Sequence, residues 1–181
     1  MMSIGDLIFQ GAEALRTTRL VEFSLSLSDS SFSLWLQDHF FAIPAFQTLH
    51  ILGIAVLFSS SLLMGLRVLG VSGRDQNLEA AYRRYRPWIW SSLAVIIFSG
   101  VILVIAEPVR NLTNPVFWTK MTLLVIGALG TLLLQSGIRH RMNSWEASPA
   151  GHATLRSGAA VLMIVWCLVI AGGRWVAYAP I

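Results

Sequence analysis

Residues 43–68, IPAFQTLHILGIAVLFSSSLLMGLRV, decide the fold, because this long apolar run contains only two ionisable side chains. A helix needs about 20 residues to cross the roughly 30 Å hydrocarbon core of a bilayer. The run is therefore long enough to span a membrane. Its ionisable residues are His50, about two turns from the beginning, and Arg67, at the end. The stretch predicts a transmembrane helix with one unusual polar group inside it.

Three further runs of the same kind follow, at about 88–105, 116–137 and 157–178. The 181 residues are 55% hydrophobic and only 12% charged, whereas a soluble domain has about 25% charged residues. Lipid is therefore the expected solvent and the bilayer the expected partner. We expect an all-α protein whose main domain, 43–178, is an integral membrane four-helix bundle.

The first 42 residues form a separate segment, which is amphipathic rather than uniformly apolar. Asp29, Ser30 and Ser31 are good N-cap residues, and the aromatic and aliphatic residues that follow alternate loosely with polar ones. This predicts a short helix after residue 31 that lies at the membrane surface. Residues 6–23 form a second candidate surface helix, and Pro44 marks the join to the first span.

The arginines predict the orientation of the chain. The links after the first and third spans are rich in arginine, whereas the link after the second holds Arg110 offset by Glu107. Arginine-rich links stay in the cytoplasm, so both termini are expected outside, in a multi-pass protein of a bacterial inner membrane. The net charge of +4 does not indicate nucleic acid as a partner, because the basic residues lie between apolar runs and not on one polar face.

His50 is the first candidate for chemistry, because ionisable groups inside a bilayer are costly and usually functional. A neutral imidazole is a good ligand for haem iron and for copper. Gly53, one turn further along, would leave room beside it for a flat macrocycle. The alternative is a histidine that hydrogen-bonds to a backbone carbonyl or to Gln47.

Lys120, the single lysine, lies about one turn into the third span, at a depth similar to that of His50. It could pair with a haem propionate, act as a second axial ligand or pair with Glu107. The alternative is a side chain that extends to the interface. Arg174, near the outer end of the fourth span, adds to a cationic cluster suited to carboxylates. Trp118 is a candidate cofactor contact, with an aromatic ring at headgroup level as the alternative.

Several segments carry a resemblance to a bacterial four-helix membrane family of unknown function. They are QTLHILG at 47–53, LMGLRVLG at 63–70, RPW at 86–88, PVFWTK at 115–120 and AGGRWVAY at 171–178. More distantly, the chain resembles the membrane-type protoporphyrinogen oxidase and the copper-resistance D-type membrane proteins. The oxidase pattern of histidine, arginine and Trp-x-x-Lys corresponds to His50, Arg67 and the one-residue-shorter Trp118-Thr119-Lys120.

This resemblance implies a membrane protein associated with haem or metal. We expect a b-type haem protein with a redox or electron-transfer role near the outer face, holding one haem per chain, because the spans contain a single well-placed histidine. His50 would bind the iron, while Lys120 and Arg174 would meet the propionates. The alternatives are a transporter for copper or another small solute, and a cofactor-free membrane anchor or assembly subunit. A second copy or a periplasmic redox partner is the expected protein contact.

Overall fold

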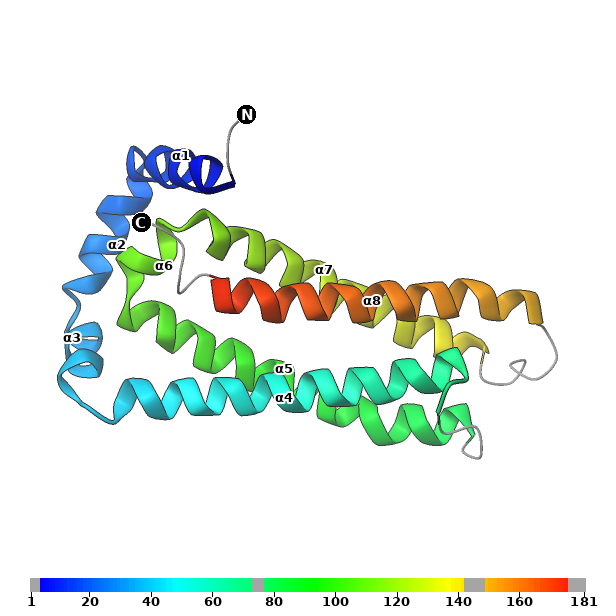
Figure 1. Cartoon of the computed structure of the whole chain (residues 1–181). Coiled ribbons are helices and arrows are strands. Elements are labelled where there is room, and N and C mark those ends of the chain that lie inside the picture. Colours follow the sequence, from blue (N-terminus) through cyan, green and yellow to red (C-terminus); the bar gives the residue numbers. More distant parts are fainter. Residues whose placement is uncertain (1–3, 73–76, 142–148, 176–181) are drawn as a thin grey trace. The chain divides into compact units, whose positions relative to one another are not determined.

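The computed structural model describes residues 4–72, 77–141 and 149–175, and in these ranges the chain is almost entirely helical, without strands. Figure 1 labels the helices in chain order. They are α1 (Ile4–Arg16), α2 (Arg19–Ser28), α3 (Ser31–Asp38), α4 (Ala42–Leu69), α5 (Leu78–Ala106), α6 (Pro108–Leu112), α7 (Pro115–Arg141) and α8 (Pro149–Trp175).

Four helices are long and apolar enough to cross a membrane: α4, α5, α7 as far as His140, and α8 from Ala153. This confirms the predicted all-α, four-helix membrane architecture and a multi-pass membrane protein. Helix α4 coincides with the first predicted span to within one residue at each end. The end of the fourth predicted span, including Tyr178, lies outside the described residues.

Helix α5 begins ten residues before the predicted span, at Leu78. Its first turns are polar but helix-favouring: Asn77 accepts a hydrogen bond from the Glu79 amide at 2.8 Å, and Glu79 pairs with Arg83 at 2.8 Å. Pro87 lies inside the helix, where it leaves the carbonyl of the residue four positions earlier without its helical donor. Arg83, Arg84 and Arg86, which precede the predicted span, therefore belong to helix α5.

The chain packs as two compact units. The first, which we call the histidine unit, comprises residues 1–52, 95–122 and 170–181. The second, the arginine unit, comprises residues 53–94 and 123–169. Every long helix contributes to both, and each unit is described by itself below.

In the histidine unit, α3 packs on the last turns of α5. Leu36 is fully buried in a cluster with Ile102 and Ala106. Ser33 Oγ donates to the Ile105 carbonyl at 2.7 Å, and Gln37 Nε2 donates to the Ala106 carbonyl at 3.1 Å. The last carbonyls of a helix have no partner within the helix. The N-terminal segment therefore satisfies the end of α5 with side chains.

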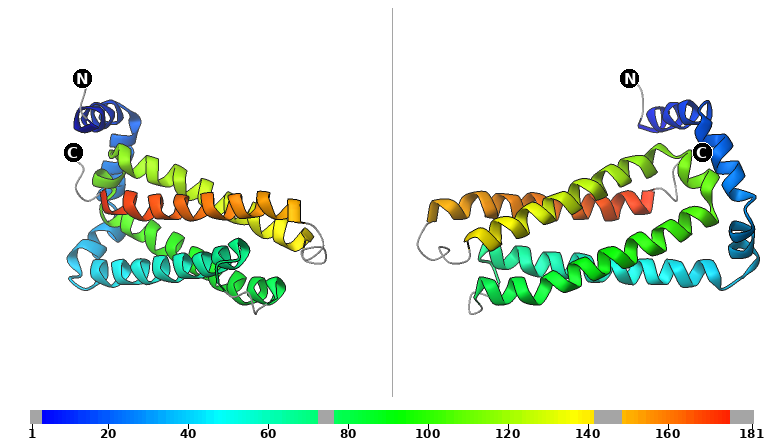
Figure 2. Two further views of the ribbon diagram at one scale, coloured as in Figure 1. Left: turned by 45° about the vertical axis from the view of Figure 1, so that its right-hand side comes forward. Right: turned by 180° about the vertical axis from the view of Figure 1, so that it is seen from behind.

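The other N-terminal helices lie beside α6 and the first turn of α7. Helix α2 packs against α6, and Figure 2 shows this pair from two further directions. In α1, a Cβ added to Gly11 would lie 3.2 Å from Pro115 Cβ. Ser30 caps α3 through the Ser33 amide, as predicted, whereas the second candidate surface helix is two helices, because Thr18 caps α2. Attachment of this segment to a membrane surface stays a prediction.

In the arginine unit, side chains of α8 pack against glycines of other helices. A Cβ added to Gly65 of α4 would lie 3.4 Å from Met163 Sδ, and one added to Gly127 of α7 would lie 3.3 Å from the Trp166 ring. Small residues let membrane helices approach closely. These glycines therefore allow bulky side chains of α8 to reach the backbones of α4 and α7.

Candidate functional site

His50 points from α4 toward α5, where two neighbouring residues contact its imidazole ring. Its Nδ1 lies 2.9 Å from Ser99 Oγ. A Cβ added to Gly100 would lie 3.2 Å from His50 Cε1, closer than side chains normally approach. Gly100 thus makes room for the ring, and Ser99 fixes its orientation.

The hydrogen bonds of Ser99 indicate which ring nitrogen of His50 carries the proton. Ser99 is fully buried, and its Oγ donates back to the Val95 carbonyl at 2.7 Å. A hydroxyl has a single hydrogen, so with that hydrogen on Val95, Ser99 Oγ acts as an acceptor. We therefore assign the proton to His50 Nδ1.

The assignment leaves His50 Nε2 with a lone pair and no hydrogen-bond partner among the described residues. Metal-binding histidines usually donate their other N–H to a carbonyl, carboxylate or water, which fixes the tautomer and the ring orientation. The contact with Ser99 does the same for His50. The ring is half-buried, so Nε2 is the atom available to an incoming ligand.

Lys120 extends from α7 along α8. Cβ atoms added to Gly172 and Gly173 would lie 3.7 and 3.8 Å from its aliphatic stem. Its Nζ lies 5.6 Å from the centre of the Phe117 ring. Among the described residues, Lys120 has no carboxylate partner. A half-buried ammonium of this kind suits an anionic group from outside the chain.

The structure brings His50 and Lys120 together in the histidine unit, close enough to interact electrostatically. The two side chains come from α4 and α7, and they are held by residues of α5 and α8. Glu107, considered as a partner for Lys120, instead pairs with Arg110 at 2.9 Å. The cationic character around Lys120 is therefore not cancelled by that carboxylate.

The remaining candidates lie at different places. Arg174 is exposed in the last turn of α8, directly after the glycines that Lys120 follows. Trp118 is 40% exposed, and its Nε1 donates to the Leu112 carbonyl at 2.9 Å, which ties α7 to α6. Gly53 is buried in α4 and belongs to the arginine unit. A cofactor contact by any of the three stays a prediction.

Sequence reasoning missed Ser99 and the specific role of Gly100. Both lie in the apolar second span, where they read as ordinary small residues. A signal was present, because Ser99-Gly100 combines a polar group with a residue that has no side chain. This pair lies about as far from the Ala106 end of α5 as His50 lies from the Ala42 end of α4. Pairing the two required knowing which faces of α4 and α5 meet.

Few side chains that could bind a metal ion lie together in the described part of the chain. Among the described residues, no group of three or more His, Cys, Asp and Glu side chains could hold a metal ion. A haem brings four nitrogen ligands of its own and needs as little as one protein-derived axial ligand. One imidazole with a free Nε2 therefore fits a haem iron better than it fits a copper ion held by protein side chains alone.

Comparisons with known proteins identify a family but no activity. No curated protein and no solved structure matches the chain. One family model covers α3 to α8 and the last residues of α2, leaving out α1 and most of α2. By this match over residues 27–179, the chain belongs to a family of unknown function, DUF6644.

Proposed function

We propose that this protein is a membrane-embedded b-type haem protein with a redox or electron-transfer role. The observation that carries the proposal is the hydrogen bond of His50 Nδ1 with Ser99, which leaves Nε2 as a lone pair without a partner among the described residues. A haem bound there would supply one-electron chemistry. The distant resemblance to haem- and metal-associated membrane proteins gives the same expectation.

Each residue around His50 has a distinct part in this proposal. Ser99 holds the imidazole ring in one tautomer and orientation. Gly100 leaves the space that the ring needs against α5. Lys120, without a carboxylate partner among the described residues, and Arg174 offer cations to propionates.

We also propose that the arginine-rich ends of the helices face the cytoplasm of a bacterial inner membrane. The first turns of α5 and the last turn of α7 carry arginines, and such ends are retained on the cytoplasmic side. His50 and Lys120 then lie toward the outer face, where a periplasmic redox partner or a second copy could exchange electrons. Cysteine accessibility at Arg84→Cys and Asp29→Cys would test this topology, with only the second expected to react from outside.

The first experiment is a visible spectrum of detergent-purified protein, oxidised and reduced, produced with ample haem. Wild type should show a Soret band that shifts on reduction, and His50→Gln should lose it. His39→Gln is the matched control, because His39 is exposed at the end of α3 and bonded to its own helix at Trp35. It should keep the wild-type spectrum.

Two further variants separate ligation from folding. Lys120→Met keeps an apolar side chain packed against α8 but removes the charge. It should therefore lower the affinity for haem, while the position of the Soret band changes little. Ser99→Ala should retain haem with an altered reduction potential, because the orienting acceptor of Nδ1–H is lost.

A folded wild type without a Soret band would reject the haem proposal. His50 and Ser99 would then be a polar pair between helices, as the cofactor-free anchor alternative requires.

A further inference from the structure

A groove of about 670 Å³ lies in the arginine unit, between α5 and α7. From α5 it is lined by Tyr82, Arg86 and Trp90, which are spaced four residues apart and share one face. From α7 it is lined by one further stripe: Leu132, Gln135, Ser136, Arg139 and His140. The haem proposal uses none of these residues.

Gln135 is the residue that marks this groove as a binding site. It is only 4% exposed, and its Oε1 accepts a hydrogen bond from Trp90 Nε1 at 3.0 Å. The indole N–H can only donate, so the amide orientation is determined: oxygen toward Trp90, nitrogen away from it. The buried Nε2 then has no partner among the described residues. A buried donor without an acceptor is costly, and an acceptor from outside the chain would remove that cost.

The other polar groups of the groove point to an anion as that acceptor. Arg86 and Arg139 supply guanidinium groups, and Tyr82 and Ser136 supply hydroxyls, whereas no carboxylate is among the described residues that line the groove. Arg86 is also placed over the Tyr82 ring, with its Cζ 5.8 Å from the ring centre. Guanidinium groups recognise phosphate oxygens through paired N–H donors.

The depth and the walls of the groove favour a lipid over a soluble anion. The apolar run of α7 gives way to Arg139 and His140, and both of these residues line the groove, so the groove lies at the level where headgroups meet a helix. Tyr82 and Trp90 are aromatic residues of the kind that prefer this level. Leu132 lines the groove and is 48% exposed, and Leu129 and Leu133 continue an exposed apolar strip along α7. That strip suits an acyl chain.

We propose that this groove binds the headgroup phosphate of an anionic phospholipid. Gln135 Nε2 donates to a phosphate oxygen, Arg86 and Arg139 neutralise its charge, and one acyl chain runs along Leu132 toward Leu129. Basic pockets between membrane helices bind acidic lipids in this way. The groove shares no residue with the proposed haem site, so this proposal stands whether or not the protein binds haem.

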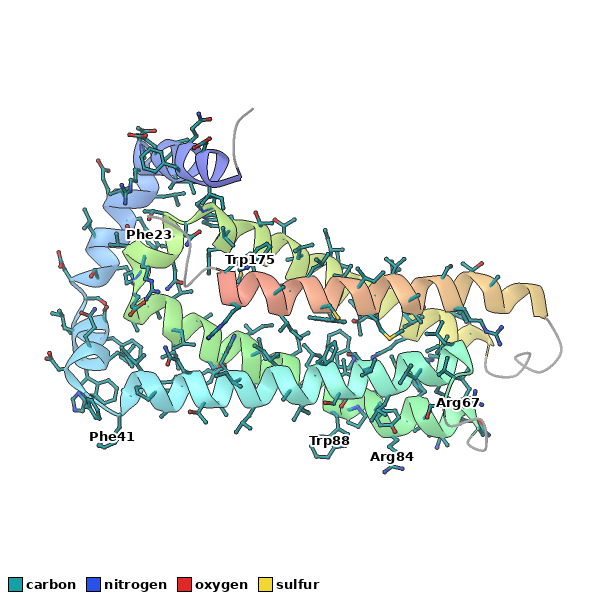
Figure 3. All side chains as sticks on the ribbon, viewed as in Figure 1. Phe23, Phe41, Arg67, Arg84, Trp88 and Trp175 are labelled. Atoms are coloured by element: carbon teal, nitrogen blue, oxygen red, sulfur yellow. The ribbon has the colours of Figure 1, made fainter. Side chains whose placement is uncertain are left out.

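Native mass spectrometry of the delipidated full chain, with phosphatidylglycerol or phosphatidylcholine of identical acyl chains added, tests the proposal. Wild type should retain phosphatidylglycerol about tenfold better, as expected for one or two charge-assisted hydrogen bonds. Gln135→Met and Arg139→Gln should each lose most of this preference. Arg84→Gln is the matched control, because it removes the same charge from α5 but its side chain points away from the neighbouring helices (Figure 3).

Three results would overturn the proposal. Equal retention of the two lipids by wild type would reject selection for an anionic headgroup. Equal losses in Arg139→Gln and Arg84→Gln would show attraction to net charge without a site. Displacement of phosphatidylglycerol by millimolar inorganic phosphate would identify a soluble phosphate as the occupant.

A further variant, Gln135→Glu, keeps the size and polarity of the side chain but adds a carboxylate that repels phosphate. It should also lose binding, and circular dichroism should show that each variant is folded.

Discussion

The histidine unit and the arginine unit each contain a polar side chain that a hydrogen bond from another helix holds, and they differ in the kind of polar atom that this bond leaves over. Each contains a side-chain hydrogen bond between two membrane helices: His50 with Ser99, and Trp90 with Gln135. His50 and Gln135 each have two polar side-chain atoms, and each uses only one of them in this bond. In the histidine unit the remaining atom is an acceptor, His50 Nε2; in the arginine unit it is a donor, Gln135 Nε2.

The comparison teaches that an interhelical hydrogen bond sets the chemistry of the atom it leaves over. Ser99 accepts from Nδ1 because its own hydrogen is used by Val95, so the free nitrogen of His50 is basic and suits a metal. Trp90 can only donate, so the free nitrogen of Gln135 is a donor and suits an anion. If Ser99 donated to His50 Nδ1 instead, Nε2 would carry the hydrogen and would be a donor.

The largest effect is expected from filling the space beside His50. Gly100→Leu forces the ring away from α5, and overpacking of a well-packed site costs about 1–3 kcal/mol. Chemical unfolding in detergent micelles should show a loss at the upper end of that range. Gly158→Leu is the control, because a Cβ at Gly158 meets nothing within 4 Å; an equal loss in both variants would mean that Gly100 has no specific role.

Removing the acceptor of His50 should have the next largest effect. Ser99→Ala leaves a half-buried N–H without its side-chain partner, at a cost of about 1–3 kcal/mol. Ser92→Ala is the matched control on the same helix, since Ser92 is buried but bonds only to its own helix at Trp88 and Ile89. Unfolding free energies should separate the two variants by at least about 1 kcal/mol. Equal values would contradict the interhelical bond.

The Trp90–Gln135 pair should show a smaller coupling. A double-mutant cycle of Trp90→Phe and Gln135→Met isolates the pair, and hydrogen bonds between membrane helices average about 0.6 kcal/mol with a maximum near 1.7. We expect a coupling free energy of about 1 kcal/mol in delipidated protein. Additive effects of the two substitutions would show that the bond contributes nothing and that the amide orientation is not held by Trp90.

Loosening the contact between α3 and α5 should cost about 0.5–1.5 kcal/mol, the usual net value of one hydrogen bond. Ser33→Ala removes the donor to the Ile105 carbonyl, so amide exchange should rise in α3. Ser26→Ala serves as the control, because Ser26 bonds only to Phe23 of its own helix. Unchanged exchange in Ser33→Ala would mean that the remaining contacts of α3 suffice.

The smallest effect is expected at the exposed pair of Glu79 and Arg83, whose side chains are 44% and 78% exposed. Glu79→Gln should change stability by no more than about 0.5 kcal/mol, as is usual for exposed helix pairs, and the change should vanish in high salt. Circular dichroism melts at two salt concentrations measure it. A larger, salt-independent loss would show that the beginning of α5 depends on this contact.

Much of the fold follows from the amino-acid sequence. The run 43–68 corresponds to α4 almost residue for residue, and Ser30 caps α3 as its position suggests. Helix α5 begins ten residues before the predicted span, because the helix-favouring residues from Leu78 to Arg86 continue the helix through Pro87. Local propensity outweighs one lost hydrogen bond there.

Only some residues of the candidate sites can be recognised in the sequence. His50 and Lys120 stand out in the sequence, because ionisable residues are rare in apolar runs and each carries a large desolvation cost. Ser99, Gly100 and Gln135 do not stand out, because a serine, a glycine or a glutamine in a helix is ordinary until its neighbour is known. Composition and apolar length thus determine that the chain is a four-helix membrane protein. Which polar atoms are paired, and which are left for a ligand, is decided by the faces that the helices turn to one another, since a hydrogen bond requires a partner within about 3 Å.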